Sequence, residues 1–365
     1  MTATGPAHTA AAAPRAWRSW HLHASSLDPR VLETVVTGAL PPVLKLVGRA
    51  AGPPPAPRPW FFIRYWQGGP HVRLRIADLT DDQADRVQQA LDERLAEVDA
   101  LLPAERRLTP EDYRRSAAPL AALGENGAPL RVGDLTPAGA HRACYEPEFA
   151  RYGGPAAMAL SEELFHASSV VCLRACAERA DHRYSFYDGL ELLAASLTAW
   201  PDPAEMLRGH HDGWRALLAG SPDGGPDWAA LDRAAAADAA RLAPVVPGLR
   251  ALAAGEPSRW SALTGRLGAA AEEWRTAFGP GRARQILGSH LHMAHNRLGL
   301  SPLREAQLAA VLLRTDLLAD GARHGGTGGP QGSGGTSEAT VPTPLTSASA
   351  TSADSGATAL RTAGS

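Results

Sequence analysis

Cysteine is scarce in this sequence, and no long apolar run occurs. The 365 residues include three cysteines, Cys144, Cys172 and Cys176, which cannot form a disulfide framework. Cys172 and Cys176 stand about one helical turn apart and are expected to be small buried residues. The first 30 residues lack the apolar core of a signal peptide, and no 18 consecutive residues are apolar. We therefore expect a soluble cytoplasmic protein without a membrane span.

Lysine is almost absent, because Lys45 is the only lysine among 36 Lys and Arg residues. With 38 Asp and Glu the formal net charge is −2, so the chain as a whole is not built to neutralise phosphates. We expect no direct binding of nucleic acid. Arginine offers a planar pair of donors to carboxylates and phosphates. A GC-rich genome would give the same arginine bias, so each arginine has to be judged by its position.

The common signatures of nucleotide, ester and metal chemistry are also missing. The sequence has no G-x-G-x-x-G, Walker, G-x-S-x-G or H-E-x-x-H motif and no C-x-x-C pair. These absences predict that no cofactor and no metal is bound, and they leave Arg, His and Glu as the groups that can do chemistry.

The composition changes near both ends of the chain. Residues 1–15 and 321–365 are expected to be a disordered leader and a disordered tail around one folded domain, 16–320. Strands are predicted at 17–23, 60–66 and 71–76, with the last two forming a hairpin. Helices are predicted at 29–50 with a break near Pro41 and Pro42, and at 80–101, 155–178, 187–199, 203–219, 227–253, 258–277, 281–298 and 302–319. The fold class is therefore α+β, with a sheet-bearing N-terminal half and a helical C-terminal half.

The second strand of the hairpin alternates perfectly between apolar and basic residues. Val72, Leu74 and Ile76 are expected to face the core, which puts His71, Arg73 and Arg75 on the other face. Two guanidiniums about 7 Å apart on one face would suit a carboxylate or a phosphate. The alternative is an ordinary solvated strand face.

A second candidate lies at Tyr145–Gly154. Glu148 and Arg151 are three residues apart and can form an ion pair, and Gly153, Gly154 and Pro155 make a tight entry to a helix. The alternative is an intrahelical ion pair with no role beyond the helix start.

A third candidate is the histidine-rich end of the predicted helix 281–298. On a helix, His290 and His292 diverge by about 200° and cannot share one metal ion, whereas His292, His295 and Asn296 lie on one side. A histidine there could transfer protons near neutral pH, and the alternative is a hydrogen-bonded core residue. The pair His210 and His211 has no third ligand at a recognisable spacing and is expected at the surface.

Three segments together resemble one known family. They are Trp60–Arg75, then Tyr145–Gly154 followed by Ser161–Phe165, and finally His292–Arg297, which reads His-Met-x-x-Asn-Arg in outline. In this order they are similar to the C-terminal, glutamate-elimination domain of lantibiotic dehydratases, which also occurs alone as the thiopeptide-type bacteriocin biosynthesis protein. The resemblance extends from about Trp17 to Arg314.

The resemblance implies a fold and a set of site residues. In that family, glutamate is first esterified to a Ser or Thr of a precursor peptide, and the elimination domain then removes it to leave dehydroalanine or dehydrobutyrine. The family's elimination residues match Arg73, Arg75, Glu148, Arg151 and His292. Arg64, His71, His295 and Asn296 lie in the same segments and are expected to contact the substrate.

The implied function is that of a stand-alone lyase that eliminates glutamate without a cofactor. Its partners would be a precursor peptide with leader and core parts and a separate tRNA-dependent glutamylating dehydratase subunit. The oligomeric state stays open and is compatible with a homodimer. One alternative is a pyridine synthase of the same fold, which joins two dehydroalanines in a formal [4+2] cycloaddition and releases the leader peptide. A third interpretation is a non-catalytic scaffold that binds the leader peptide.

Overall fold

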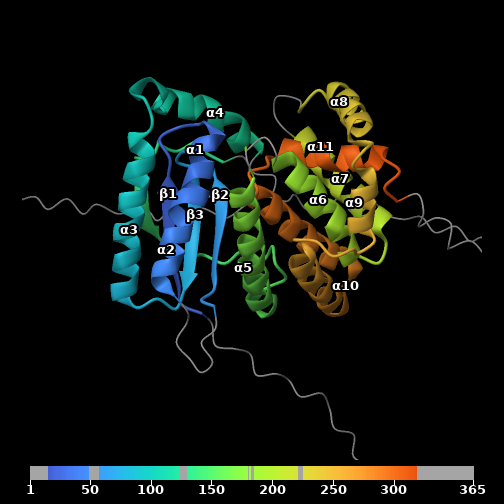
Figure 1. The fold of residues 1–365 in the computed structure, drawn as a ribbon, viewed down its shortest axis with the longest axis horizontal. Helices are drawn as coiled ribbons and strands as arrows, with labels where there is room; N and C mark the ends of the chain where they lie inside the picture. The colour runs from blue at the N-terminus through green and yellow to red at the C-terminus, as the bar shows by residue number, and fades with distance from the viewer. Residues whose placement is uncertain are drawn as a thin grey trace, which may run out of the picture.

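The computed structural model describes residues 15–48, 57–123, 130–179, 181, 185–220 and 225–318. It has a small sheet in its N-terminal half and helices in the rest, which confirms the predicted α+β class (Figure 1). The predicted disordered tail lies outside the described residues, as does the predicted leader apart from Arg15.

Four antiparallel strands form the sheet. They are β1 (Trp17–His23), β2 (Trp60–Tyr65), β3 (His71–Ala77) and β4 (Gly139–Ala143), in the order β2-β3-β1-β4. The predicted hairpin is confirmed, since Tyr65 pairs with His71 and Trp60 with Ile76. Its turn needs glycine, because Gly68 and Gly69 both have positive φ and a Cβ on Gly68 would lie 2.8 Å from Thr136 Oγ1. β4 was not predicted.

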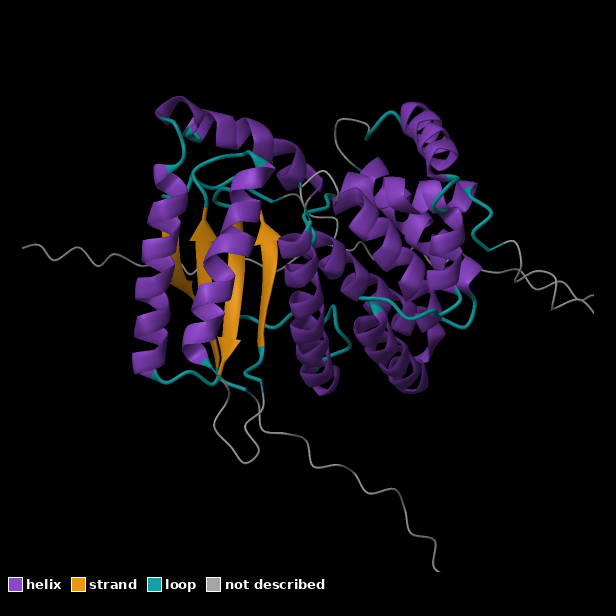
Figure 2. Ribbon diagram, viewed as in Figure 1, coloured by secondary structure: helices purple, strands orange, loops and turns teal. Residues whose placement is uncertain are grey.

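Alternation gives the sheet one apolar and one polar face. Trp20, Leu22, Val72, Leu74 and Ile76 are buried on the apolar face. The helices α1 (Pro29–Thr34), α2 (Leu40–Val47) and α3 (Asp81–Ala100) cover that face (Figure 2). The prediction that the even-numbered residues of β3 enter the core is thus confirmed. The opposite face carries His21, His23, His71, Arg73 and Arg75.

The first predicted helix, 29–50, is divided by a change of helix type. Residues Val35–Ala39 form a π-helical segment between α1 and α2, and Pro41 and Pro42 occupy the first turn of α2. Proline is tolerated there because the first N–H groups of a helix have no partner within the helix. The next helix was predicted closely: α3 begins after a capping box formed by Thr80 and Gln83.

The C-terminal half consists of helices α5 (Pro155–Glu178), α6 (Ser185–Ser196), α7 (Pro203–Ala219), α8 (Trp228–Leu242), α9 (Val246–Ala253), α10 (Ser261–Arg297) and α11 (Pro302–Arg314). Predicted helix 227–253 is two helices, with Pro247 in the first turn of α9. The two helices predicted at 258–277 and 281–298 are both present as the two parts of α10, which is interrupted at Gly279, where φ 79° and ψ 165° are not helical, next to Pro280. The helix α4 (Pro110–Leu123) was not predicted.

Side chains from the helical half bind the outer edge of the sheet. β2 is an edge strand, so no other strand of the described residues lies along one side of its backbone. Ser169 on α5 accepts a hydrogen bond from the Phe62 N–H (3.2 Å). Asn296 on α10 accepts from the Arg64 N–H (2.8 Å) and donates to the Arg64 carbonyl (2.9 Å). These bonds satisfy the edge and hold the two halves together.

Helix α5 is the one helix among the described residues that is long and apolar enough to cross a membrane by length and composition. Half of its most apolar stretch is buried inside the protein. It packs between β2 and α10 (Figure 1), and Cys172 and Cys176 on it are buried, as predicted. We therefore interpret α5 as a core helix.

Candidate functional site

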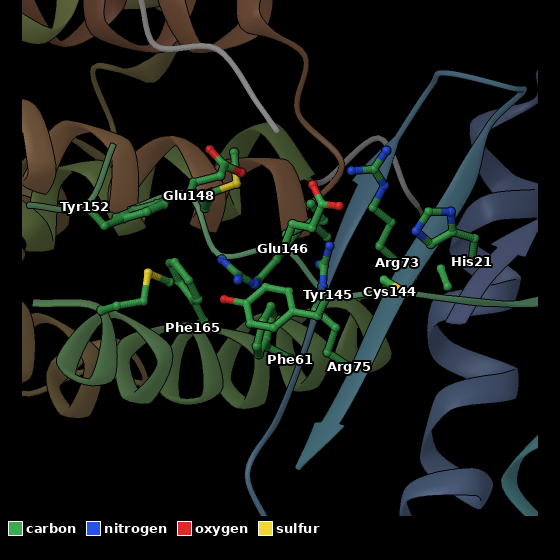
Figure 3. A pocket seen from close by; sticks show the side chains of 15 residues that line it. His21, Phe61, Arg73, Arg75, Cys144, Tyr145, Glu146, Glu148, Tyr152 and Phe165 are labelled. Carbon is green, nitrogen blue, oxygen red and sulfur yellow. The ribbon is translucent and has the colours of Figure 1, made fainter. Parts of the chain in front are cut away.

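A cavity of about 250 Å³ opens between the polar face of the sheet and the helical half (Figure 3). Arg73 and His21 project from the sheet on one side, and Glu148 and Tyr152 lie on the other. The lining residues are His21, Phe61, Ile63, Arg73, Arg75, Ala143, Cys144, Tyr145, Glu146, Glu148, Tyr152, Met158, Phe165, Met293 and Arg297. The strands, the loop before α5 and the end of α10 thus meet at one place.

Two neighbours position Arg73 at the cavity. Its Nε donates to His71 Nε2 (3.2 Å), and its guanidinium carbon lies 3.6 Å from the centre of the Tyr65 ring. His71 Nδ1 lies 2.9 Å from the Gly69 carbonyl oxygen. Nδ1 must therefore carry the proton while Nε2 accepts from Arg73. Burial lowers the pKa of His71 well below its ordinary value, so the ring is neutral and can accept this bond.

Arg75 is buried against aromatic rings. Its guanidinium carbon lies 5.2 Å from the centre of the Phe61 ring and 5.1 Å from that of Tyr145. Burial, with a smaller contribution from the Arg73 charge, lowers the pKa of Arg75 to about 10. Arg75 is therefore still positively charged at neutral pH. Within the described part of the chain its guanidinium forms no ion pair, and its buried Nε has no hydrogen-bond partner.

The loop before α5 supplies a carboxylate to the cavity. Glu148 Oε2 accepts from Arg151 Nη1 (3.2 Å), so the predicted pairing of these residues is confirmed. The two residues precede α5, and the pair is therefore not intrahelical. Gly153 has φ 87°, and a Cβ there would lie 2.8 Å from the Phe278 ring. Glycine at 153 thus lets the loop turn tightly against α10.

His292 lies deeper than these residues and does not line the cavity. Its Nδ1 is 2.7 Å from Glu305 Oε1, and Oε2 of the same carboxylate is 3.1 Å from Nδ1 of His295. The prediction that His292 and His295 share one side of the helix is thus confirmed. Burial, followed by the Arg151 charge, lowers the pKa of His292 well below its ordinary value. The Arg151 charge therefore acts on His292 as well as on Glu148.

Of the five elimination residues expected from the sequence, Arg73, Arg75 and Glu148 line the cavity. Arg151 and His292 do not line it: Arg151 pairs with Glu148, and His292 is buried against Glu305. The structure thus brings three of the five residues to the cavity.

The structure does not place the four expected substrate-contact residues in the cavity. Arg64 pairs with Val72 in the sheet, so it points to the other face, where it forms an ion pair with Glu33 (2.5 Å). Asn296 binds the edge of β2, His295 is fully buried against Glu305, and His71 acts on Arg73 instead. Alternation along β2 excludes Arg64 from the cavity face.

The expectation of a surface position for His210 is wrong. His210 is buried, accepts a hydrogen bond from Trp214 Nε1 (3.3 Å) and lies near His295. The apolar side of α7 carries it against α10 and α11. Two further residues were missed by the sequence reading: Arg297, which lines the cavity, and Glu305, which holds both histidines.

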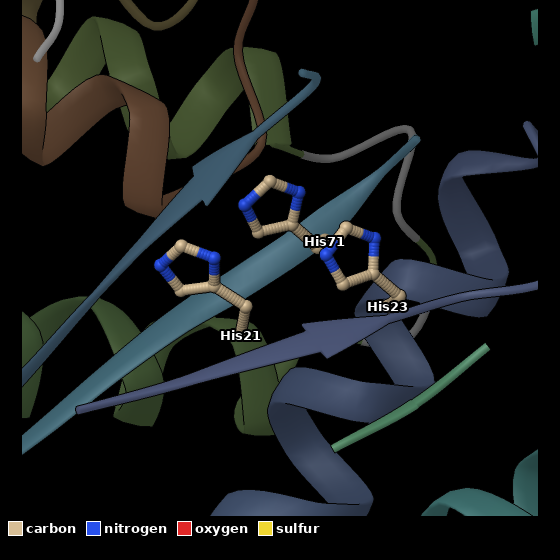
Figure 4. Close-up of side chains that lie close together, drawn as sticks. All are labelled: His21, His23 and His71. Carbon is tan, nitrogen blue, oxygen red and sulfur yellow. The ribbon is translucent and has the colours of Figure 1, made fainter. Parts of the chain in front are cut away.

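Among the described residues, two groups that contain histidine each bring three possible metal-ligand atoms within 4.8 Å of one another. In the first, His21, His23 and His71 form a stack on the polar face of the sheet (Figure 4), with ring centres 5.0 and 4.2 Å apart. Because the rings are stacked, their in-plane lone pairs point side by side and not toward one common point. Both nitrogens of His71 also have polar neighbours already. The second group, His210, His295 and Glu305, is fully buried. Its carboxylate is already engaged by two imidazoles.

Comparison with known proteins gives one family match. The family model described as "Lantibiotic biosynthesis dehydratase C-term" matches residues 17–315. A search of curated protein sequences found no match.

Several solved structures are similar in fold. The pyridine synthase TbtD from thiomuracin biosynthesis aligns with a TM-score of 0.62 at 17% identity, covering 83% of this chain and 98% of TbtD. TsrL aligns with a TM-score of 0.53 at 16% identity, covering 84% of this chain and 96% of TsrL. The tRNA-dependent lantibiotic dehydratase MibB from Microbispora sp. 107891 aligns with a TM-score of 0.49 at 21% identity, covering 88% of this chain and 29% of MibB. At these identities TbtD and TsrL establish the fold alone.

Proposed function

Because the chain belongs to the lantibiotic dehydratase C-terminal family, we propose that it eliminates glutamate from glutamylated Ser or Thr residues of a precursor peptide. The observation that carries the proposal is the charge of the cavity. Arg73, Arg75 and Arg297 all line it, and Arg75 and Arg297 form no ion pair within the described residues. Glu146 and Glu148 also line the cavity, so three arginines face two carboxylates, and this excess of cations suits an anionic group of a substrate. A glutamyl ester provides such a group in its free carboxylate, which it carries beside an ammonium group.

The reaction breaks two bonds and forms one double bond. A base removes the Cα proton of the esterified Ser or Thr, and negative charge develops on the adjacent carbonyl oxygen. The Cβ–O bond then breaks, its electron pair leaves with the glutamate carboxylate, and Cα=Cβ forms. No electrons are gained from or lost to another reagent, so no cofactor is required. Arg73 and Arg75 would stabilise the developing charges, which is where preorganised donors act most strongly.

We propose two groups for the proton transfer, one at the cavity and one buried behind it. Glu148 lines the cavity, and its carboxylate is oriented by Arg151. His292 is neutral, and its Nδ1 is bound to Glu305. Nε2 is therefore the ring nitrogen that can accept or donate a proton. Either group could serve as base, and the other would then assist the departure of glutamate.

The proposed partners follow from the substrate. Residues 16–320 would form the elimination-type domain, and another protein, a tRNA-dependent dehydratase subunit, would make the glutamyl ester. The peptide would supply a leader and a core to the same chain in the cytoplasm. Since the chemistry needs only Arg, Glu and His side chains, neither tRNA nor a metal ion should be needed for elimination.

The second candidate is pyridine synthesis, favoured by the similarity to TbtD over 98% of that chain. Its substrate would be two dehydroalanines, which carry no charge. The arginines of the cavity would then have no anionic group of the reacting residues to bind. A leader-binding scaffold, the third candidate, would not require this charged cavity at all.

The deciding experiment gives the purified protein a glutamylated precursor peptide and records product masses. Elimination should release free glutamate and leave the peptide lighter by one water than its unmodified form. An intact ester, together with conversion of a bis-dehydroalanine peptide into a macrocycle and free leader, would establish the pyridine synthase instead. An intact ester with tight leader binding and no macrocycle would support the scaffold.

A further inference from the structure

The second edge of the sheet is formed by β4, and the pairing of the strands shows which of its backbone groups face outward. Next to the β1–β3 ladder, the Ala24 N–H donates to the Pro70 carbonyl (3.0 Å), so the even-numbered residues of β1 bond toward β3. The odd-numbered residues of β1 therefore bond to β4, where their partners are also odd-numbered. The N–H and carbonyl groups of Ala140 and Arg142 consequently point away from the sheet.

Among the described residues, one hydrogen bond reaches these outward groups. It runs from Gln88 Nε2 to the Ala140 carbonyl (2.9 Å), whereas the Ala140 N–H and both backbone groups of Arg142 have no hydrogen-bond partner in that part of the chain. At the β2 edge, by contrast, side chains from the helical half bind the backbone. The Arg142 side chain pairs with Asp85 on α3 (2.6 Å), so it turns away from the edge and leaves its backbone open.

The β4 edge leads into the cavity. One row of residues that lie opposite each other across the four strands consists of Ile63, Arg73, His21 and His141. The first three line the cavity, so a strand added beside β4 would place a residue next to His141 on the cavity side of the sheet. Ala143 at the end of β4 and the residue directly after it also line the cavity. A peptide that follows β4 is therefore directed to the same opening.

We propose that the β4 edge binds the core part of the precursor peptide as a fifth, extended strand. This inference rests on the proposed function, because it takes the substrate to be a peptide with a residue that enters the cavity. Neighbouring strands lie about 4.8 Å apart, so the added strand would lie about 14 Å from β3, a distance that about four extended residues span. The paired segment is therefore close to the reacting residue. Binding through the backbone would let one site accept Ser and Thr residues in different sequence contexts.

The test is an N-methyl scan of the glutamylated precursor peptide. Each residue within about eight positions of the modified Ser is N-methylated in turn, and kcat/KM for glutamate release is measured. N-methylation removes a backbone donor and adds a methyl group where the two strands would meet. Because alternate N–H groups of a strand face its neighbour, kcat/KM should fall about 10-fold at two residues that are two apart and less than about 2-fold at the residue between them. Equal losses at adjacent residues, or no loss at any residue, would overturn the inference.

Two variants of one residue test the protein side. Arg142→Ala and Arg142→Pro both remove the guanidinium, but Arg142→Pro also removes the outward N–H. Proline is found at sheet edges where the missing N–H would face outward, so Arg142→Pro should fold. Its kcat/KM should be about 10-fold below that of Arg142→Ala, mainly through a higher KM. Equal values for the two folded variants would contradict the inference. If Arg142→Pro does not fold, the N-methyl scan on the wild-type protein decides.

Binding of the precursor peptide with free Ser hydroxyls separates this surface from the reaction. Its affinity for the wild-type protein should fall on N-methylation at the same alternate residues. If that pattern appears but no glutamate is released from the ester, the surface stands and the proposed function fails. If glutamate is released without any alternation, the function stands and the surface fails. A wild-type dimer, measured by light scattering, that Arg142→Pro converts into a monomer would mean that a second copy of the chain occupies the edge, which would also overturn the inference.

Discussion

Nδ1 of His292 lies 2.7 Å from Oε1 of Glu305, and no part of the Glu305 side chain is exposed. The two residues come from different helices, α10 and α11. Burial raises the pKa of Glu305 and lowers that of His292, so neither group favours its charged form alone. Their hydrogen bond holds one proton between them and fixes the imidazole ring. Nε2 is then the position of His292 that is left for proton exchange.

Glu305→Gln should slow elimination about 10- to 100-fold, as loss of an orienting carboxylate does at other imidazole sites. A carboxylate makes its imidazole partner more basic, so the acidic limb of the kcat profile should also move to lower pH. The groups that face His292 are Arg151, His210, His295 and Arg297, and all of them are retained in the variant. The measurement is single-turnover release of glutamate from pH 5 to 9. Glu97→Gln, on the exposed side of α3, is the control. An unchanged rate and profile would refute a role for Glu305.

Arg73→Ala should trap the glutamylated peptide. Losing one preorganised donor to developing charge costs roughly 3–4 kcal/mol, or two to three orders of magnitude in rate. His71 and Tyr65 hold Arg73 in place, so His71→Ala should give a weaker defect of the same kind. Mass spectrometry would detect accumulated ester. Arg142→Ala on β4, where Arg142 pairs with exposed Asp85, should eliminate glutamate at the wild-type rate. Normal turnover by Arg73→Ala would remove Arg73 from the site.

The residues whose positions were predicted correctly follow the regular repeat of side chains along a single strand or helix. Alternation along β3 predicts that Arg73 and Arg75 share a face, and helical spacing predicts that His292 and His295 share a side. Both relationships are present in the structure. Neither prediction requires knowing which other helix or strand packs against the element.

The residues that were missed or misplaced depend on contacts between distant elements. Glu305 reaches His292 only because α11 packs against α10. His210 is buried only because α7 packs against α11, which brings its ring near His295 on α10. Arg297 lines the cavity only because the end of α10 packs against β2. Arg64 is a different case, because alternation along β2 already puts it on the opposite face of the sheet. β4 was missed because Gly139–Ala143 has no apolar alternation and is defined by its pairing with β1.

Asn296→Ala should destabilise the protein without removing a cavity residue. Asn296 makes two hydrogen bonds to the backbone of Arg64, and its loss leaves an edge N–H and carbonyl of β2 unpaired. Each such group costs about 1–3 kcal/mol, so the free energy of unfolding should fall by roughly 2–4 kcal/mol. Urea denaturation measures this loss. Gln89→Ala on the exposed face of α3 should change stability by less than about 0.5 kcal/mol. A similar small effect of Asn296→Ala would mean that β2 is held by other contacts.

The buried histidines should make stability fall in mild acid. Burial lowers the pKa of His210 to about 4 and that of His295 to about 3, whereas an unfolded histidine titrates near 6.5. Between pH 6.5 and pH 4 the unfolded chain binds more protons than the folded chain, so the free energy of unfolding decreases as the pH falls through this window.

His210→Gln tests this assignment, because glutamine keeps an acceptor for Trp214 Nε1 and cannot take up the proton. At pH 5 the slope of unfolding free energy against pH should be shallower than in wild type by about 1 kcal/mol per pH unit. Above pH 8 neither the folded nor the unfolded histidine is protonated, so the two slopes should coincide there. Urea denaturation at half-unit pH steps gives both slopes. Equal slopes at pH 5 would mean that His210 takes up a proton in the folded protein as readily as in the unfolded chain. The structure predicts otherwise, because His210 is buried and its Nε2 accepts a hydrogen bond from Trp214.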